Sequence, residues 1–518
     1  VSSPIVVGDL LFVTCYSGYG IDRNAPGEID KLVRHLLCFD AVSGEKKWQK
    51  DFPAAMPEDP YTGIGVTAHG YASHTPVSDG RHVYVFFGKS GAFAFDFDGE
   101  QLWHASLGTE SDPWAWGSSS SPIVYENILI VTASAESQAI VGLDKETGKE
   151  VWRQEASGLD GMWGTPTLVK IDDSRTDLVL SVPKEIWGLN PSNGKMRWHS
   201  LATGADQAHS SAVVDGNTVF AFTGRGRGSV AVRAGGQGDV TASNVVWTGR
   251  DSDRFASAVA FESKLYLVAD GVLTVIDEAT GKHVSHVHLD GGNAGGGGVM
   301  GGSDYGSPVI ADGKLYYTKG NGDTFVFSTG EKDPVQLSVN LLTTDKETFG
   351  GSPAISNGRM FIRSDKNLYC VAKTGTEVAP NASESLIAKS DATDTGGDRP
   401  QGGRGGGPGG GGRGGFDPTA IFKDRDKDSD GKLTKEEMAG SSMADRFAEI
   451  DKDKDGSVTL EEFEANLRAL FAGGGPGGRG GPGGRGGAGG GGGRGGFGGG
   501  NREDNRPNRP QRPEADDK

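Results

Sequence analysis

The chain is built from a repeated unit that extends from Val1 to about Gly375, and this repeat restricts it to a repeat architecture. The first half of a unit reads Ser-Pro, two apolar residues, a turn with Asn or Asp beside Gly, and an apolar strand. The second half reads a strand, an Asp, a Thr-Gly-Lys-like turn and then a Trp. The clearest first halves start at Ser2, Ser73, Ser120 and Gly306, and the clearest second halves end at Trp48, Trp103, Trp152 and Trp198.

The spacing of the units gives the size of the element that each one forms. By subtraction, the turn residues Asp40, Asp96, Asp144 and Asn190 are 56, 48 and 46 residues apart. These periods lie at or slightly above the length of a four-stranded propeller blade, about 40 to 50 residues. Short runs rich in Val, Ile, Phe and Tyr between Gly, Asn and Asp turns are typical of such blades. We count about eight units and therefore predict an all-β fold, a β-propeller of about eight blades.

Two features of the units concern how the ring is held together. We expect the Trp of each unit to pack beneath the turn of the next unit and so to lock neighbouring blades. The eighth unit stops after its third strand, in the sequence LYCVAKTG that begins at Leu368. Closing the ring would require a strand from the N-terminal end, so we expect either a segment upstream of Val1 or an incomplete eighth blade.

The composition changes abruptly at about Asn381 and divides the rest of the chain. Much of the excess among the 86 glycines lies in two tracts, Gly396 to Gly415 and Gly473 to Gly500. Such tracts cannot bury enough apolar surface to fold. We predict a propeller over residues 1–375, a glycine-rich linker over 376–415, a small all-α domain over 416–472 and a disordered tail rich in Gly, Arg and Pro over 473–518.

Two stretches of the small domain match the DxDxDGxxxxxE pattern of an EF-hand calcium loop, in which oxygen ligands surround the ion and a Gly makes the turn. Gly431 and Gly456 are these turn residues, and Leu433 and Val458 can pair as a short β-bridge. An acidic solvated run can mimic one such loop, but a tandem match is far more specific. We predict two calcium ions, bound by Asp426, Asp428, Asp430, Lys432, Thr434 and Glu437 and by Asp451, Asp453, Asp455, Ser457, Thr459 and Glu462.

Polar and aromatic residues precede the innermost strands of several units, in loops that should surround the top of the central channel. They are His69, His74, Asp112, Trp114, Trp116, Trp163, His209, Arg254, Asp304 and Tyr305. Convergent groups of this kind are able to bind a ligand or a peptide. Ring packing alone also places such residues near the axis, where backbone groups satisfy isolated histidines, and this structural interpretation is the simpler one.

With its AxD, Thr-Gly-Lys and Trp positions in register, the repeat resembles the pyrroloquinoline-quinone (PQQ) repeat over about three quarters of the chain. Such repeats build the quinoprotein alcohol dehydrogenases and the eight-bladed lipoprotein subunit of the outer-membrane β-barrel assembly machine. The resemblance implies the fold but not an activity, since the fold hosts both enzymes and scaffolds. The dehydrogenases use an adjacent-cysteine disulfide and a catalytic Asp. This chain has no adjacent cysteines, and no Asp aligns with that position, so we expect no PQQ.

Composition weighs against two other classes of function. The formal charge of −17 and a pI near 5.1 argue against strong nucleic-acid binding, even though the glycine tracts hold a few arginines in RGG-like sequences. No run of about 18 apolar residues predicts a transmembrane segment. Three scattered cysteines, Cys15, Cys38 and Cys370, match neither a disulfide framework nor a zinc site.

The sequence therefore favours a calcium-binding, non-catalytic propeller that acts as an interaction scaffold for a protein or peptide. Because the chain starts at Val1 rather than at a methionine, an export signal can have been removed, and we expect a periplasmic or cell-envelope protein. Two alternatives remain open: a PQQ-dependent dehydrogenase with its site in the channel, and an intracellular calcium sensor.

Overall fold

The computed structural model describes residues 2–62, 65–223, 228–252, 255–292, 305–330 and 333–373, and then 432–434, 450, 452, 454–460, 462 and 509. The chain divides into two compact units, one of residues 1–389 with 501–518 and one of residues 390–500. Within the described residues, no helix is long and apolar enough to cross a membrane. Cys15, Cys38 and Cys370 are free thiols.

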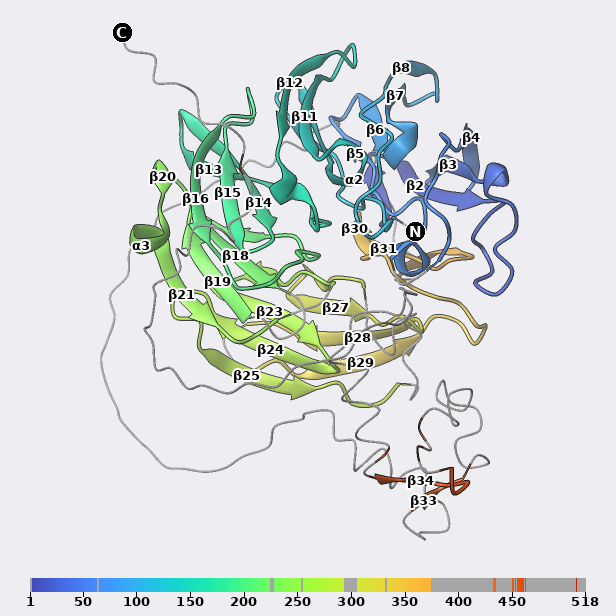
Figure 1. Ribbon diagram of the computed structural model, residues 1–518, viewed down its shortest axis with the longest axis vertical. Coiled ribbons are helices and arrows are strands. Elements are labelled where there is room, and N and C mark those ends of the chain that lie inside the picture. Colours follow the sequence, from blue (N-terminus) through green and yellow to red (C-terminus); the bar gives the residue numbers. More distant parts are fainter. Residues whose placement is uncertain are drawn as a thin grey trace, which may run out of the picture. The chain divides into compact units, whose positions relative to one another are not determined.

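The first unit is an eight-bladed β-propeller, and its blades follow one another around a ring in chain order (Figure 1). Blade 1 consists of β1 (Ile5–Val7), β2 (Leu10–Ser17), β3 (Val33–Asp40) and β4 (Lys46–Pro53). Blade 2 consists of β5 (Val77–Ser78), β6 (His82–Phe86), β7 (Ala92–Asp96) and β8 (Gln101–Ala105). Blade 3 consists of β9 (Ile123–Tyr125), β10 (Ile128–Ala133), β11 (Ala139–Asp144) and β12 (Glu150–Glu155). Blade 4 consists of β13 (Thr167–Asp172), β14 (Arg175–Val182), β15 (Glu185–Leu189) and β16 (Met196–Leu201), to which β20 (Gly238–Asp239) adds a parallel edge.

The remaining blades repeat this meander. Blade 5 consists of β17 (Val213–Asp215), β18 (Thr218–Thr223), β19 (Gly228–Arg233) and β21 (Val245–Gly249). Blade 6 consists of β22 (Val259–Phe261), β23 (Lys264–Ala269), β24 (Val272–Asp277) and β25 (His283–His288). Blade 7 consists of β26 (Val309–Ala311), β27 (Lys314–Thr318), β28 (Asp323–Ser328) and β29 (Gln336–Leu341). Blade 8 has three strands within the described residues, β30 (Ala354–Ser356), β31 (Arg359–Arg363) and β32 (Leu368–Ala372).

Short helices lie in the loops between strands. They are η1 (Ile29–Lys31), α1 (Val66–His69), η2 (Gly88–Ser90), α2 (Ser134–Ser137), η3 (Ser157–Leu159) and α3 (Thr241–Asn244). The apolar core lies between neighbouring blades rather than within one: Phe86 and Trp103 of blade 2, for example, pack in one cluster with Leu129 and Val141 of blade 3. Each blade therefore depends on its neighbours to bury its apolar faces.

A closed circle of eight hydrogen bonds joins the start of each blade to the next. In each bond, the backbone N–H of a Ser or Thr donates to the hydroxyl of the equivalent residue one blade further on, over 2.9 to 3.3 Å. The eight residues are Ser3, Thr75, Ser121, Thr165, Ser211, Ser257, Ser307 and Ser352. The circle gives partners to partly buried backbone donors, and it explains the Ser-Pro pattern of the repeat.

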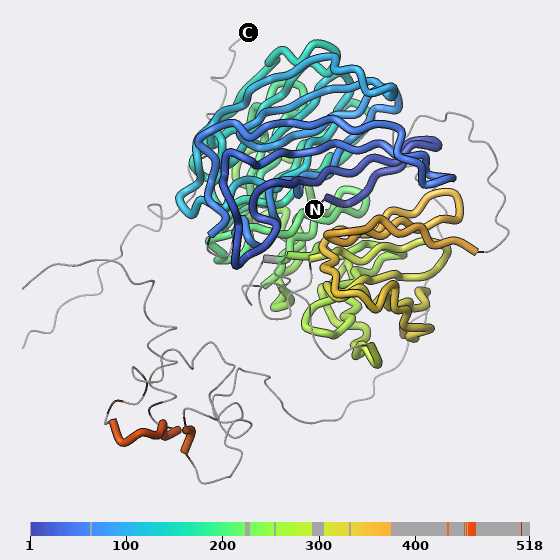
Figure 2. The backbone as a smooth tube through the Cα atoms, turned by 90° about the vertical axis from the view of Figure 1, so that its right-hand side faces the viewer, coloured from blue at the N-terminus to red at the C-terminus, as the bar shows by residue number. Residues whose placement is uncertain are grey.

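Blade 8 lies beside blade 1 and completes the ring (Figure 2). The N–H of Ser352 donates to Oγ of Ser3 over 2.9 Å. The buried guanidinium of Arg363 donates to Oγ and the carbonyl oxygen of Ser2 and to the carbonyl oxygen of Thr14. Within the described residues the eighth blade has three strands, and polar contacts join it to blade 1.

The predicted tryptophan lock is confirmed at four of the five tryptophans that close a unit. Trp103 donates its indole N–H to the carbonyl oxygen of Lys145 over 2.8 Å, and its ring lies against Gly148 in the turn of blade 3. Trp48, Trp152 and Trp247 make the corresponding contacts with the turns that contain Gly99, Gly194 and Gly281. Trp198 differs, because its indole N–H donates to Asp177 of its own blade over 2.7 Å.

In the second unit, two short strands are described. They are β33 (Lys432–Leu433) and β34 (Val458–Thr459), which pair antiparallel with Leu433 opposite Val458. Both of these side chains are buried. The predicted bridge between the two loops is therefore present, whereas the rest of the predicted all-α domain lies almost wholly outside the described residues.

Candidate functional site

Most of the predicted channel-mouth residues come together at one end of the propeller. His69 lies on α1, just before blade 2, and Trp114 and Trp116 lie in the loop before blade 3. Trp163, His209 and Tyr305 each precede the first strand of blades 4, 5 and 7. Because every blade starts near the axis, these segments converge as predicted. The predicted Arg254 and Asp304 lie outside the described residues.

The aromatic side chains form a continuous arc, which we call the aromatic arc: Trp114, Trp116, Trp163, His209, Phe255 and Tyr305. Neighbouring ring centroids lie 4.7 to 6.4 Å apart, and the Trp163 and His209 rings stack at 4.7 Å. Offset and tilted pairs at these separations attract one another beyond simple burial. The arc crosses from blade 3 to blade 7, and Phe255 is the member that the sequence analysis missed.

Asp112 positions the tryptophans of the arc. Its carboxylate accepts hydrogen bonds from the backbone N–H groups of Trp114, Trp116 and Gly117, over 2.8 to 2.9 Å. The indole N–H of Trp163 donates to the carbonyl oxygen of Gly117 over 2.8 Å. A short loop held by four such bonds keeps its aromatic side chains in place without a helix or strand around them.

His69 and His74, two of the three predicted histidines, are neutral at pH 7. Burial lowers the pKa of His69 to about 4 and that of His74 to about 3. Nε2 of His69 lies 2.8 Å from the carbonyl oxygen of Trp116, so this nitrogen carries the proton and donates. Nε2 of His74 lies 3.1 Å from Oγ of Ser118. Both rings thus fasten the mouth loops together, in agreement with the structural interpretation of isolated histidines.

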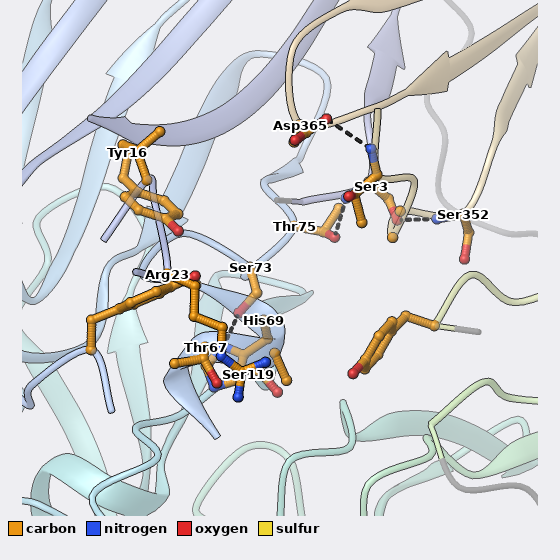
Figure 3. Close-up of a pocket in the computed structure, with 18 residues that line it drawn as sticks. Ser3, Tyr16, Arg23, Thr67, His69, Ser73, Thr75, Ser119, Ser352 and Asp365 are labelled. Carbon is orange, nitrogen blue, oxygen red and sulfur yellow. Dashed lines mark hydrogen bonds between the residues drawn. The ribbon is translucent and has the colours of Figure 1, made fainter. Parts of the chain in front are cut away.

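An open pocket of about 410 Å³ lies beside the arc and above the circle of Ser and Thr residues. Figure 3 shows Tyr16 and Arg23 on one side of this pocket and Ser352 and Asp365 on the other. Tyr305 of the arc and His69 also line it. Tyr16 lies on β2 of blade 1 and Arg23 lies in the long β2–β3 loop, which shows no sequence motif of its own.

A cluster of buried charged side chains lies under the mouth, and the sequence analysis did not foresee it. Arg34 pairs with Glu58 over 2.5 Å, and Lys89 pairs with Asp59 over 3.1 Å. A small cavity of about 20 Å³ among these side chains has room for about one water molecule. These residues come from hairpins and loops that differ between blades, so no repeat signal marks them.

Glu136 of α2 is the unusual member of this cluster. Its Oε1 accepts a hydrogen bond from Ser118 over 2.7 Å, and its Oε2 has no partner within the described residues. Burial raises the pKa of Glu136 to about 7. The carboxyl group therefore changes its charge near neutral pH, in a cavity too small for a substrate.

A Ser–His–Asp line occurs on the surface of blade 1. Ser17 Oγ lies 2.7 Å from Nε2 of His35, and Nδ1 of His35 lies 2.6 Å from Oδ1 of Asp51. The Asp51 side chain is 57% exposed, whereas the acid of a hydrolase triad is buried and works beside an oxyanion hole. We therefore assign this line to the hydrogen bonding of the sheet surface.

Half of the predicted calcium ligands are described. In the second loop, Oδ1 of Asp455 accepts hydrogen bonds from the N–H and hydroxyl of Ser457, and Glu462 accepts from the N–H and hydroxyl of Thr459. Gly456 has φ +89°, as its turn position requires. The Ser457 hydrogen bonds lower the pKa of Asp455 to about 2, so this carboxylate is charged at neutral pH.

The first loop is described at Lys432 and Thr434, and the ammonium group of Lys432 pairs with Oδ2 of Asp455 over 3.0 Å. Carboxylate, hydroxyl and carbonyl oxygens are the donors that calcium prefers, so the described residues fit the ion. The other predicted ligands lie outside the described residues: Asp426, Asp428, Asp430, Glu437, Asp451 and Asp453.

Comparison with known proteins finds one match in the propeller and one in the predicted calcium-binding domain. The family model described as outer membrane protein assembly factor BamB matches residues 32–284, and the EF-hand model matches residues 443–467. No curated protein matches the chain. These matches confirm a PQQ-like propeller repeat and an EF-hand region that includes the second loop.

Solved structures of low sequence identity resemble the fold. BamB from Moraxella catarrhalis is 13% identical, with a TM-score of 0.48 over 71% of this chain and 95% of that protein. A europium-containing methanol dehydrogenase is 12% identical, with a TM-score of 0.46 over 70% of this chain and 81% of that enzyme. The computationally designed Ika8 protein is 10% identical, with a TM-score of 0.44 over 72% and 95%. Such distant likenesses carry no information about activity.

Proposed function

We propose that this protein is a calcium-binding, non-catalytic scaffold whose propeller binds a protein or peptide at the channel mouth. The observation that carries the proposal is the aromatic arc beside the open pocket. Aromatic side chains with a few polar neighbours are the usual energetic centres of protein interfaces. Trp114 is 42% exposed at one end of the arc, so part of this aromatic surface is available to a partner.

The state of the polar groups at the mouth favours binding over catalysis. A general base needs a pKa near the working pH and access to the substrate. His69 and His74 have strongly lowered pKa values and hydrogen-bond to neighbouring loops, and three backbone N–H groups engage Asp112. Glu136 has a suitable pKa of about 7, but it lies at a cavity of about 20 Å³.

Calcium would be held by the twelve predicted oxygen donors of the tandem loops, as two ions. Its chemistry there is structural, because it would cross-link carboxylates that otherwise repel one another. The match to an outer-membrane assembly factor supports an envelope location. At millimolar calcium, a site with a dissociation constant of about 10⁻⁴ M would be mostly filled.

The binding proposal can be tested with a phage-displayed library of short random peptides selected on the intact protein. The selected peptides should lose at least about 30-fold in affinity on Trp114→Ala, because an aromatic hot spot contributes about 2 kcal/mol or more. Leu102→Ala is the matched control, because Leu102 is 44% exposed on β8, away from the arc. Peptides that bind Trp114→Ala and a Trp116→Ala variant as tightly as wild type would contradict the proposal.

A quinone-dependent dehydrogenase is the competing function, and the tryptophans that pack against one another at the mouth are the observation that favours it. The discriminating assay adds PQQ and calcium to the purified protein and follows dye-linked oxidation of alcohols. The scaffold proposal predicts no turnover above a protein-free control. Turnover that disappears in Trp116→Ala would replace the scaffold proposal with the enzyme. An intracellular sensor would instead show a calcium-dependent hydrophobic-dye response.

A further inference from the structure

A buried carboxylate on blade 4 binds an arginine from the C-terminal segment. Glu185 is the first residue of β15, and its side chain is completely buried. Oε2 accepts a hydrogen bond from the indole N–H of the buried Trp187 over 2.8 Å. Nε of Arg509 donates to the same oxygen over 2.7 Å, and Nη2 of Arg509 donates to Oε1. The guanidinium thus meets the carboxylate at two points, from 324 residues away in the chain.

The blade itself does not require an acid at this position. In seven of the blades the pairing register shifts within the third strand; in blade 4 the shift falls directly after Gly188, and Glu185 stands three residues before Gly188. Counting back in the same way from Ala94, Gly142, Ala231 and Val275 gives small or apolar residues in four other blades: Gly91, Ala139, Gly228 and Val272. Among the seven blades that carry this register shift, an acid stands at the position in blades 4 and 7, and blade 1 has His35 there.

Blade 7 also has an acid at this position, but that acid has a different partner. Its residue at the same position is Asp323, which is also buried, and the nearby amide of Asn321 donates to it over 2.9 Å. Asp323 thus accepts a hydrogen bond from a residue of its own hairpin. Glu185 has one donor from its own strand, Trp187, and a buried carboxylate with a single neutral donor is expensive to keep charged. The arginine supplies the compensating charge.

We propose that Glu185 is an arginine-accepting docking site on the propeller and that its occupant is the protein's own C-terminal segment, through Arg509. The ligand class is an arginine followed by proline, since Pro510 follows Arg509 and the same pair occurs at Arg506 and Arg512. The docked Arg509 side chain remains 23% exposed, so it enters the site from the surface. This proposal does not depend on the scaffold function.

The docking site adjoins the aromatic arc. Glu185 directly follows the turn of Pro183 and Lys184. A Cβ atom placed on Gly161 would lie 3.5 Å from Cγ of Pro183 and 3.5 Å from Cη2 of Trp114, so these two side chains lie close to the same point. The docking site at Glu185 therefore borders the face proposed for a partner.

Arginine-selective labelling of the intact protein tests the docking directly. Phenylglyoxal modifies exposed guanidinium groups, and mass spectrometry then gives the rate at each arginine. Arg506 and Arg512 are internal controls, because they stand in the same Arg-Pro context. We expect Arg509 to react about tenfold more slowly than both, the factor that corresponds to about 1.4 kcal/mol of docking energy.

Glu185→Gln is the matched variant, because its amide oxygen can still accept from Trp187 while the negative charge is lost. In this variant, Arg509 should react at the rate of Arg506 and Arg512. Circular dichroism and thermal unfolding would verify that the propeller remains folded. Equal rates at the three arginines in the wild-type protein would overturn the proposal, and so would unchanged protection of Arg509 in a folded Glu185→Gln variant.

Discussion

The propeller and the tandem calcium loops both consist of repeated motifs, but a consensus residue has a different role in each. In the propeller, the recurring Trp, Gly and Ser or Thr residues hold one blade to the next. The residues of the mouth, such as Glu136 and Trp114, stand where the repeats differ. In the calcium loops, the recurring residues are themselves the predicted ligands. Consensus residues thus hold the structure together in the propeller and carry the proposed function in the predicted calcium loops.

Among the consensus residues of the propeller, replacement of a locking tryptophan should lower the free energy of unfolding the most. Trp152 is buried, and its indole N–H donates to the carbonyl oxygen of Pro191 in the next blade over 3.1 Å. Trp152→Ala should lower the free energy of unfolding by about 3 to 5 kcal/mol. Denaturant titration measures this, with the exposed neighbour Val151→Ala as a control that should stay within about 0.5 kcal/mol. Equal stability of the two variants would show that the tryptophans do not lock the blades.

A non-consensus residue of the mouth should make stability depend on pH. Because burial raises the folded-state pKa of Glu136 to about 7, the stabilisation by its neutral form is complete below the unfolded pKa of about 4.5 and is lost as pH rises through 7. Glu136→Gln stays neutral throughout. Its stability relative to wild type should therefore increase by about 3 kcal/mol between pH 4 and pH 8.

The buried histidines have the opposite pH dependence. Their lowered pKa values make stability fall as pH decreases below about 6.5, in wild type and variant alike. The difference in the free energy of unfolding between wild type and Glu136→Gln therefore reports on the ionisation of the Glu136 carboxyl group alone. Denaturant titrations of both proteins at pH 4, 6 and 8 provide the measurement. A constant difference across this range would mean that Glu136 ionises like an exposed carboxyl group.

A smaller effect separates backbone strain from the tryptophan contact. Gly194 has φ +71°, and a Cβ there would lie 2.4 Å from Cε3 of Trp152. Gly44 occupies the same turn of blade 1 with φ +76°, and nothing lies within 4 Å of its Cβ position. Gly44→Ala should cost about 1 to 2 kcal/mol from strain alone, and Gly194→Ala should cost about 1 to 3 kcal/mol more from crowding. If thermal unfolding shows that the two variants lose similar amounts of stability, contact with Trp152 does not contribute to the cost of Gly194→Ala.

The fold was largely predictable because the packing of a blade recurs in every unit. The period, the Asp turns and the Trp positions together predict the eight blades and the lock between them. Trp198 departs from the lock because blade 5 has a degenerate turn, and Asp177 accepts its indole N–H instead. The Ser-Pro pattern was visible, but the circle of hydrogen bonds that it forms requires knowledge of the neighbouring blade.

The site was only partly predictable, because its residues come from segments that do not repeat. Loops that enter the innermost strands converge in any propeller, so Trp116, Trp163 and His209 could be placed at the mouth. The partner of a buried charge is a matter of tertiary packing, and nothing near Glu58 or Glu136 in the sequence indicates Arg34 or Ser118. The contact between Glu185 and Arg509 was hidden for the same reason, since a tail of this composition predicts disorder.

Calcium binding is tested most directly by calorimetric titration of the intact protein beside a Glu437→Gln, Glu462→Gln double variant. These two glutamates close the predicted loops, so their replacement removes a ligand from each ion and leaves the propeller untouched. We predict two binding events in the wild-type protein, their loss in the double variant, and equal thermal stability of the two propellers in the absence of calcium. Absence of calcium binding by the wild-type protein, or full binding by the double variant, would contradict the assignment of the tandem loops.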